Sequence, residues 1–503
     1  MREQLASIWK NLEEYICCAL LGVIMTLLMM QVCYRYFGGK SIAWSEEVSR
    51  FLFLYLVYFA ASLAASKNLH IRVTAQLKLL PKLGQMLLLL TTDIIWLVFC
   101  IIVVNVGTDF IISMSDRPMV SGALMLDMRY VYAAVHRLYL AGRPPRRALV
   151  AHLHQARSLS RSQRGGILMS LEVLIWIALA VLLVMGTPIF VSLGMASITV
   201  LLLSDIPLSL VMIDLIKVSD MFPLLAVVGF VFAGALMERG GMAAQIVEVA
   251  MLVGHIRGGL GIVTILGCMF FASMIGSGPG TVAAMGSIMI PSMIKRGYSP
   301  EYAAGVSATG GTLGILIPPS NPMLVYGIIA NVSISALFTA GFVPGALVGT
   351  CLMFTAYTIA RRHGYKGTMH SYTMAEFGRA LLKNIWSLMA PVVILGGIYA
   401  GICTPVEASV VAVWYALFVG FFITKKLSLK EVFNAMKLAN ISTGTILIVV
   451  GVSTIFGRFL TMYQIPQQLA AQMMLYTTNP ILILLLIAAL LFFLGMFMET
   501  LAT

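Results

Sequence analysis

Charged residues are scarce in this chain, where they make up 11% of 503 positions against 60% hydrophobic residues. The mean hydropathy of +0.96 is outside the range of soluble domains. Apolar runs of about 17 to 25 residues recur along the chain, each long enough to cross a bilayer as a helix. The composition therefore excludes an ordinary soluble protein and predicts an all-α polytopic membrane protein with on the order of a dozen membrane segments.

Groups that would mark an enzyme or an ATP-driven pump are also missing. The sequence has no P-loop, so nothing in it predicts ATP-driven transport. The seven His residues form no pairs within apolar segments, which argues against a membrane redox subunit. All seven Cys lie in or beside apolar segments and are expected to be small buried hydrophobes. We expect no catalytic residues and no cofactor.

The charge is unbalanced, with 33 basic against 20 acidic residues and a formal net charge of +13. Many basic residues stand in short loops, such as residues 361–367 and 424–426. This distribution is typical of cytoplasmic loops, which lie against membrane lipid, and does not require a nucleic-acid partner.

Two interruptions mark the apolar stretch 273–327: GSGPGT at 276–281 and IPPSNP at 317–322. A helix is broken at membrane depth only where protein or a water-filled cavity surrounds the break, and paired breaks are typical of transporter sites. Close packing of glycines and a packed proline kink would be the structural alternative. We expect a substrate or ion site formed by Ser277, Gly278, Thr281, Thr309, Gly314, Pro318, Pro319, Ser320 and Asn321. Neutral oxygen ligands suit Na⁺, for which the candidate ligands are Ser277, Gly278, Ser320 and Asn321.

Sequence motifs resemble those of a known transporter family. QVCYRY (31–36), WSEEVSRFLF (44–53) and H-I-x-V (70–73) resemble the small, DctQ-like membrane subunit of tripartite ATP-independent periplasmic (TRAP) transporters. GSGPGTVAAMGSIMIPSM, KRGYSPEYAAG and GTLGILIPPSNPMLVYG resemble the large, DctM-like subunit, a member of the ion-transporter superfamily. Two departures are Ile275, where the family pattern has Ser, and Gly280, where it has Ala.

The resemblance implies a fold and a function. It implies a small-subunit segment at 1–135, whose fourth helix is degraded, and a large-subunit segment at 167–503. The residues between them, 136–166, are interpreted as a basic linker. The resemblance further implies an elevator-type transporter with inverted repeats and re-entrant helical hairpins in the bacterial inner membrane. A Na⁺ gradient would drive import of an organic acid anion, of the C4-dicarboxylate, sugar acid or sialic acid type, delivered by a periplasmic solute-binding protein. A Na⁺/dicarboxylate symporter that needs no binding protein is the alternative, and a channel is a more distant one.

The element T-P-x-E-A also matches the large-subunit pattern and adds Thr404 and Glu407 to the candidate site residues. A Glu beside a helix start can equally complement the helix dipole without any role in binding.

Residues 136–164 contain seven Arg, three His and no acid, where the resemblance implies a fourth apolar helix. A basic linker at a lipid surface is one interpretation. The alternative hypothesis is a shifted reading frame, which resequencing of the gene would test.

An internal repeat is predicted from the similarity of residues 229–250 to residues 453–474. At the same spacing, the counterpart of the GSGPGT tip falls at 498–503, which places Glu499 and Thr500 in a second candidate site. We therefore expect an incomplete transporter whose second sodium site lacks its downstream half and which is unable to complete a transport cycle.

Overall fold

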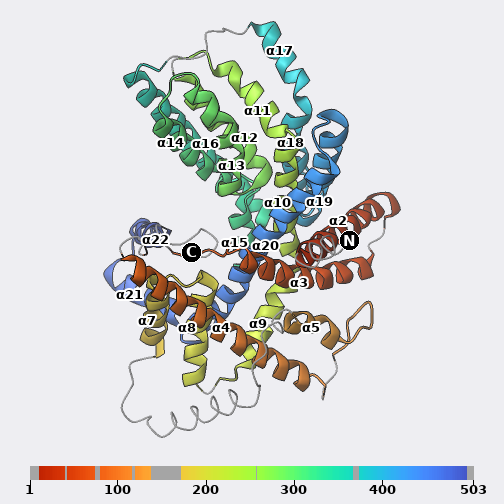
Figure 1. Cartoon of the computed structure of the whole chain (residues 1–503), viewed down its shortest axis with the longest axis vertical. Coiled ribbons are helices and arrows are strands. Elements are labelled where there is room, and N and C mark those ends of the chain that lie inside the picture. The colour runs from red at the N-terminus through yellow and green to blue at the C-terminus, as the bar shows by residue number, and fades with distance from the viewer. Residues whose placement is uncertain are drawn as a thin grey trace. The chain divides into compact units, whose positions relative to one another are not determined.

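The computed structural model describes residues 11–39, 42–73, 77, 80–115, 119–137, 171–204, 206–256, 258–365 and 373–495. These residues are almost entirely helical (Figure 1). Within them, seven helices are long and apolar enough to cross a membrane, or up to eight if a bent pair is counted as one span. The bent pair consists of Ala375–Lys383 and Ile385–Tyr399. The predicted all-α polytopic membrane fold is confirmed.

The number of long spans is smaller than the expected dozen or so, because several apolar runs are divided into shorter helices. Glycine and proline divide them, as at Gly186, whose φ is +77°, and at Pro188, which precedes α8. Four apolar helices of 10 to 17 residues result: Val173–Val184, Ile189–Leu203, Gly259–Ile275 and Pro480–Gly495.

The chain folds into two compact units, residues 1–13, 47–221 and 444–503 in the first and residues 14–46 and 222–443 in the second. The elements before the first break are α2 (Leu12–Gly38), α3 (Ala43–Ser66), α4 (Lys82–Ser113), α5 (Met128–Arg137), α7 (Leu171–Val184), α8 (Ile189–Leu203), α9 (Ser209–Ser219), η2 (Phe222–Leu224), α10 (Leu225–Arg239), α11 (Met242–Ala250), η3 (Met251–Val253) and α12 (Gly259–Ile275). The later elements are α13 (Gly278–Ile294), α14 (Pro300–Gly311), η4 (Thr312–Ile315), α15 (Asn321–Ile329), α16 (Ile334–Arg362), α17 (Met374–Lys383), α18 (Ile385–Tyr399), α19 (Pro405–Phe418), η5 (Val419–Ile423), α20 (Leu429–Met462), α21 (Ile465–Tyr476) and α22 (Pro480–Gly495).

The core of the first unit is formed by apolar side chains of α4, α8, α9 and the second part of α20. Small residues bring these helices close together, as is usual where lipid gives no hydrophobic drive for association. A β-carbon on Gly194 of α8 would lie 2.4 Å from a ring carbon of Phe99 on α4. Asp214 of α9 is fully buried in the same unit and is paired with Arg458 of α20.

The H-I-x-V motif connects α3 to α8 in the first unit. The backbone N–H of Ile189 donates to the carbonyl of Ile71 at 3.1 Å. His70 is buried, and its Nε2 donates to the carbonyl of Ala61 at 3.1 Å. The imidazole ring lies 4.7 Å from the ring of Phe190 and 5.5 Å from that of Trp96. Burial lowers the pKa of His70 to about 4, so this loop is packed around a neutral imidazole.

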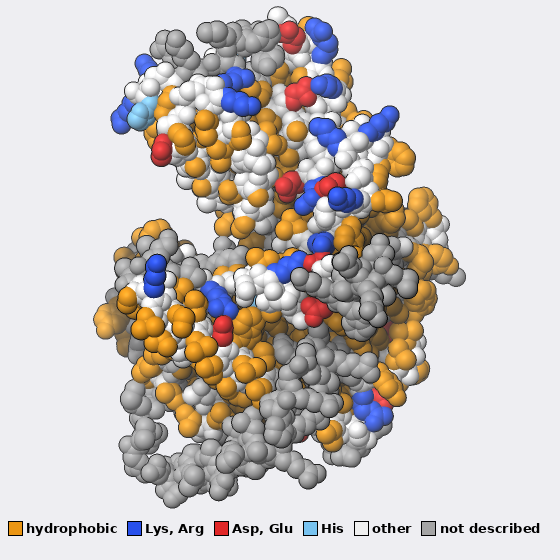
Figure 2. Space-filling view, viewed as in Figure 1, with side chains coloured by type: hydrophobic (Ala, Val, Ile, Leu, Met, Phe, Trp, Pro, Cys, Tyr) orange, Lys and Arg blue, Asp and Glu red, His pale blue; other side chains and the backbone are white. Residues whose placement is uncertain are grey.

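In the second unit, α10 packs against α19, and α12 packs against α13, α14 and α16 (Figure 1). The helices carry many exposed apolar side chains, as Figure 2 shows on one face. Examples are Val343 at 75% and Phe354 at 68% exposure on α16. Such a surface is unfavourable in water but matches the hydrocarbon of a bilayer.

The sequence repeat has a local structural counterpart. Residues 229–239 end α10 and are followed by a turn at Gly241, with φ +78°, and then by α11. Residues 453–462 end α20 and are followed by a turn at Gln464, with φ +54°, and then by α21. Both copies thus form a helix, a left-handed turn residue and a second helix.

Candidate functional site

The first interruption forms the tip of a helical hairpin. Helix α12 ends at Ile275, and Gly276 then takes a φ of +66°, which a glycine adopts without strain. Ser277 begins α13 because its Oγ accepts the N–H of Gly280 at 3.5 Å, and Pro279 fits the first turn, where no N–H partner is needed. The predicted turn at GSGPGT is therefore present.

The second interruption lies between α14 and α15. Helix α14 gives way to the short 3₁₀ helix η4, and the Pro318–Pro319 peptide bond is cis. Ser320 then begins α15, where its Oγ accepts the N–H of Met323 at 3.5 Å and donates to the carbonyl of Ile315 at 2.6 Å. No continuous helix accommodates this sequence, as predicted.

The two interruptions are in direct contact. The N–H of Asn321 donates to the carbonyl oxygen of Gly276 at 3.1 Å. A β-carbon on Gly276 would lie 2.4 Å from the carbonyl oxygen of Pro319, and one on Gly314 would lie 2.6 Å from the Oγ1 of Thr281. The glycines thus permit backbone to meet backbone, and the predicted juxtaposition of the two motifs is observed.

The contact gathers groups of opposite polarity. The N-terminal ends of α13 and α15 lie here, each equivalent to about +0.5 elementary charge. Backbone carbonyls of the Ile275–Gly276 and Pro318–Pro319 segments supply hard oxygen atoms. Asn321 is 2% exposed, and neither atom of its side-chain amide has a hydrogen-bond partner among the described residues. A buried amide of this kind requires an explanation, and an ion or water at the site would supply one.

Several of the predicted hydroxyls donate to nearby backbone carbonyls. The Oγ1 of Thr281 donates to the carbonyl of Ser277 at 2.8 Å, and the Oγ of Ser320 donates to that of Ile315 at 2.6 Å. Thr309 itself is exposed and donates to Gly305, one turn earlier in α14. Thr309 stays a predicted site residue, and its hydroxyl also donates to the carbonyl of Val306 at 3.3 Å. Glu499 and Thr500 lie outside the described residues.

Ile275 and Gly280, the two departures from the family pattern, pack against each other. A β-carbon on Gly280 would lie 3.2 Å from the Cγ2 of Ile275, and one on Gly234 of α10 would lie 2.6 Å from its Cγ1. Ile275 is 5% exposed and fills the space between the hairpin tip and α10. An apolar side chain here supplies packing and no oxygen ligand.

Thr404 and Glu407 form a capping box at the start of α19, which was the structural alternative for this pair. The N–H and hydroxyl of Thr404 donate to the Oε2 of Glu407 at 2.8 and 2.9 Å. Within the described chain, the side-chain hydrogen bonds of both residues are made at this helix start and to Arg35 of α2.

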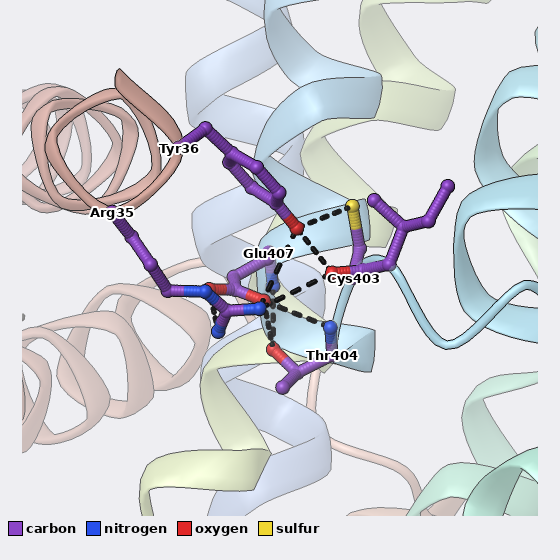
Figure 3. A network of polar contacts seen from close by, with 6 residues as sticks. Arg35, Tyr36, Cys403, Thr404 and Glu407 are labelled. Carbon is purple, nitrogen blue, oxygen red and sulfur yellow. Dashed lines mark hydrogen bonds and ion pairs between the residues drawn. The ribbon is translucent and has the colours of Figure 1, made fainter. Parts of the chain in front are cut away.

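Arg35 and Tyr36, at the end of α2, form a polar network that the sequence pattern did not predict (Figure 3). Arg35 Nη1 donates to Oε1 of Glu407 at 2.6 Å, and its Nη2 donates to the carbonyl of Ile402 at 3.2 Å. Tyr36 donates its hydroxyl to the same carbonyl and lies 3.6 Å from the Sγ of Cys403. The sequence does place an Arg in the last turn of an apolar helix, which indicates a polar partner for it. It could not identify that partner, because Glu407 lies 372 residues away.

Comparison with known proteins identifies the family. Residues 176–503 match the tripartite ATP-independent periplasmic transporter, DctM component, and residues 24–141 match the DctQ component. The isethionate TRAP transporter permease protein DctMQ of Oleidesulfovibrio alaskensis is 34% identical over 98% of this chain and 81% of its own length. The sialic acid TRAP transporter permease protein SiaT of Haemophilus influenzae is 30% identical over 98% of this chain and 84% of its own length.

A third relative corresponds to the large segment. The C4-dicarboxylate TRAP transporter large permease protein DctM of Pseudomonas aeruginosa is 39% identical over 61% of this chain and 72% of its own length. One chain thus carries both membrane components, as the recognised motifs predicted. The chain belongs to the TRAP transporter permeases and is a multi-pass inner-membrane protein of that family.

Proposed function

We propose that this chain is the membrane permease of a Na⁺-driven importer of an organic acid anion, which a periplasmic solute-binding protein delivers. The contact between the two helix interruptions carries the proposal, because it joins backbone carbonyls to two helix N-terminal ends. Such discontinuous helices bind coupling ions and anionic substrates in secondary transporters.

The cation and the anion would use different groups of this site. Carbonyl oxygens near Gly276 and Pro319 and the Oδ1 of Asn321 are hard, neutral ligands suited to a partly dehydrated Na⁺. The first turns of α13 and α15 present N–H groups, which attract an acid anion. Transport would then proceed by an elevator movement, as expected for the family.

The relatives indicate the substrate class to try first. Their names specify isethionate, C4-dicarboxylate and sialic acid, all of which are organic acid anions. Isethionate stands first because its DctMQ transporter matches both segments with 34% identity, against 30% for the sialic acid permease SiaT.

Uptake into proteoliposomes tests the proposal. We expect accumulation of labelled isethionate, C4-dicarboxylate or sialic acid to require both an inward Na⁺ gradient and the matching solute-binding protein. Uptake without the binding protein would favour the symporter alternative, and uptake with no dependence on Na⁺ would overturn the coupling. Uptake by the chain of 503 residues would also show that the expectation of an inactive, incomplete transporter is wrong.

Direct ²²Na⁺ binding tests the site independently of transport. Asn321→Leu is expected to weaken Na⁺ binding at least about tenfold, which corresponds to the loss of one favourable ligand interaction of about 1.4 kcal/mol. Thr355→Val is the matched control, since Thr355 is not a candidate site residue and its hydroxyl donates to the carbonyl of Cys351 within α16. Equal Na⁺ binding by wild type and Asn321→Leu would remove Asn321 from the site.

A further inference from the structure

Arg35 forms an ion pair with the carboxylate that caps α19. Glu407 is 8% exposed and uses its two oxygens differently. Its Oε1 accepts from Arg35, while its Oε2 accepts the N–H and hydroxyl of Thr404 and so fixes the start of α19 (Figure 3). Without the guanidinium, the carboxylate would remain buried with its charge uncompensated, which is unfavourable inside a membrane protein. Arg35 therefore stabilises the position at which α19 begins.

The first turns of α19 are packed rigidly against α10. The Oγ of Ser409, two residues after Glu407, donates to the carbonyl of Val406 at 2.7 Å. A β-carbon on Gly229 of α10 would lie 2.1 Å from that Oγ and 2.7 Å from the Cβ of Ser409. Since the Ser409 side chain fills the space that a side chain on Gly229 would occupy, a displacement of the start of α19 is transmitted to α10.

Helix α10 touches the hairpin tip at a second glycine. The side chain of Ile275 occupies the space in which a β-carbon on Gly234 would stand, 2.6 Å from its Cγ1. Ile275 is the last residue of α12, and the next residue, Gly276, accepts the N–H of Asn321. A continuous series of packed contacts thus leads from Glu407 to the two interruptions, all within the second unit.

We propose that Arg35 is a positioning residue for the contact between the two helix interruptions, acting through Glu407, Ser409 and the glycines of α10. Arg35 lies in the segment that matches the DctQ component, whereas the interruptions lie in the segment that matches the DctM component. The small segment would thereby influence the affinity of the large segment for Na⁺. This part of the proposal rests on the proposed function of the contact as a Na⁺ site.

Two readouts on the purified full chain test the inference. We expect Arg35→Gln to raise the half-saturating Na⁺ concentration in ²²Na⁺ binding by about fivefold or more, the range of ordinary coupling between sites. Hydrogen exchange of the backbone amides at 275–281 should also become faster. Arg35→Lys retains the positive charge and should restore both readouts towards the wild-type values.

Lys383→Gln is the matched control, because Lys383 forms an ion pair of the same 2.6 Å length with Glu248 but contacts neither α19 nor α2 through that pair. It should leave both readouts unchanged. Wild-type exchange at 275–281 and wild-type Na⁺ affinity in a folded Arg35→Gln variant would overturn the inference. If the wild type binds no Na⁺, the proposed function fails, and the exchange readout alone still decides whether Arg35 positions the tip.

Discussion

At the scale of single residues, Asn321 and His70 are both buried polar side chains with unsatisfied atoms. Both amide atoms of Asn321 lack a partner among the described residues, and so does the Nδ1 of His70. Their surroundings differ in kind. Asn321 stands where two helix interruptions meet, whereas His70 is packed between aromatic rings. The unsatisfied amide of Asn321, among backbone carbonyls outside regular helix, indicates a ligand site. The unsatisfied nitrogen of His70, among aromatic rings, indicates a role in packing.

The burial of His70 predicts a stability that depends on pH. Its pKa is lowered to about 4, so the folded chain prefers the neutral imidazole, while the unfolded chain binds a proton below the ordinary value of 6.5. The contribution of the neutral His70 to stability is therefore fully present above pH 6.5 and is lost as the pH falls towards 4. Between pH 7.5 and pH 5 the loss should be about 2 kcal/mol.

Thermal denaturation in detergent at both pH values measures this loss. His70→Leu should reduce the difference in Tm between the two pH values. His255→Leu replaces an exposed His and should keep the wild-type difference. An unchanged difference in His70→Leu would show that other groups cause the acid sensitivity.

At the scale of elements, glycine has different roles at different places in the same pair of interruptions. Gly276 has a φ of +66° and no room for a β-carbon beside the Pro319 carbonyl. A β-carbon on Gly305, in the interior of α14, would have nothing within 4 Å of it. The first glycine is required by geometry, and the second is not.

Alanine at these two positions should consequently have opposite effects. Gly276→Ala is expected to destabilise the chain by about 1–3 kcal/mol or more through backbone strain and the clash. Gly305→Ala should stabilise it by about 0.5–1 kcal/mol through higher helix propensity. Tm and Na⁺ binding of the two variants provide the comparison, and a Gly276→Ala variant with wild-type values for both would contradict the described tip.

The contact between α10 and α19 makes a second prediction at this scale. Gly229→Ala should lower the Tm, because the added methyl group would lie 2.1 Å from the Oγ of Ser409. Combining it with Ser409→Gly removes the clashing side chain and should recover most of the lost stability. If the effects of the two substitutions on the Tm were simply additive, the two helices would not meet at this point.

At the scale of the whole molecule, the distribution of charge predicts the side of the membrane on which loops lie. The end of α16 carries Arg361 and Arg362, followed by the exposed His363. Basic residues in short loops remain on the cytoplasmic side, so this end of α16 is expected there.

Labelling of an introduced thiol tests this expectation. His363→Cys, in a Cys351→Ser background that removes an exposed native thiol, should react with a membrane-impermeant maleimide only after the cells are opened. Labelling of intact spheroplasts would place this loop outside and would contradict the assigned orientation.

The sequence by itself determined the membrane class, the positions of both interruptions and the family, because these depend on composition and on local backbone chemistry. Low charge favours a lipid-facing helical chain, and the clusters of glycine and proline at 276–281 and 317–322 end a helix locally. The oxygen-rich site was predicted from the same residues and stays a prediction, which the Na⁺-binding experiment tests.

Only the tertiary structure decided which distant residues meet. The ion pair between Arg35 and Glu407 spans 372 positions, and the packing of Ile275 against Gly234 depends on how α10 and α12 cross. Such contacts are set by shape and close packing over the whole unit, and no local pattern encodes them. For the same reason the sequence did not predict that Glu407, whose role in binding stays a prediction, pairs with a residue of the small segment and caps α19.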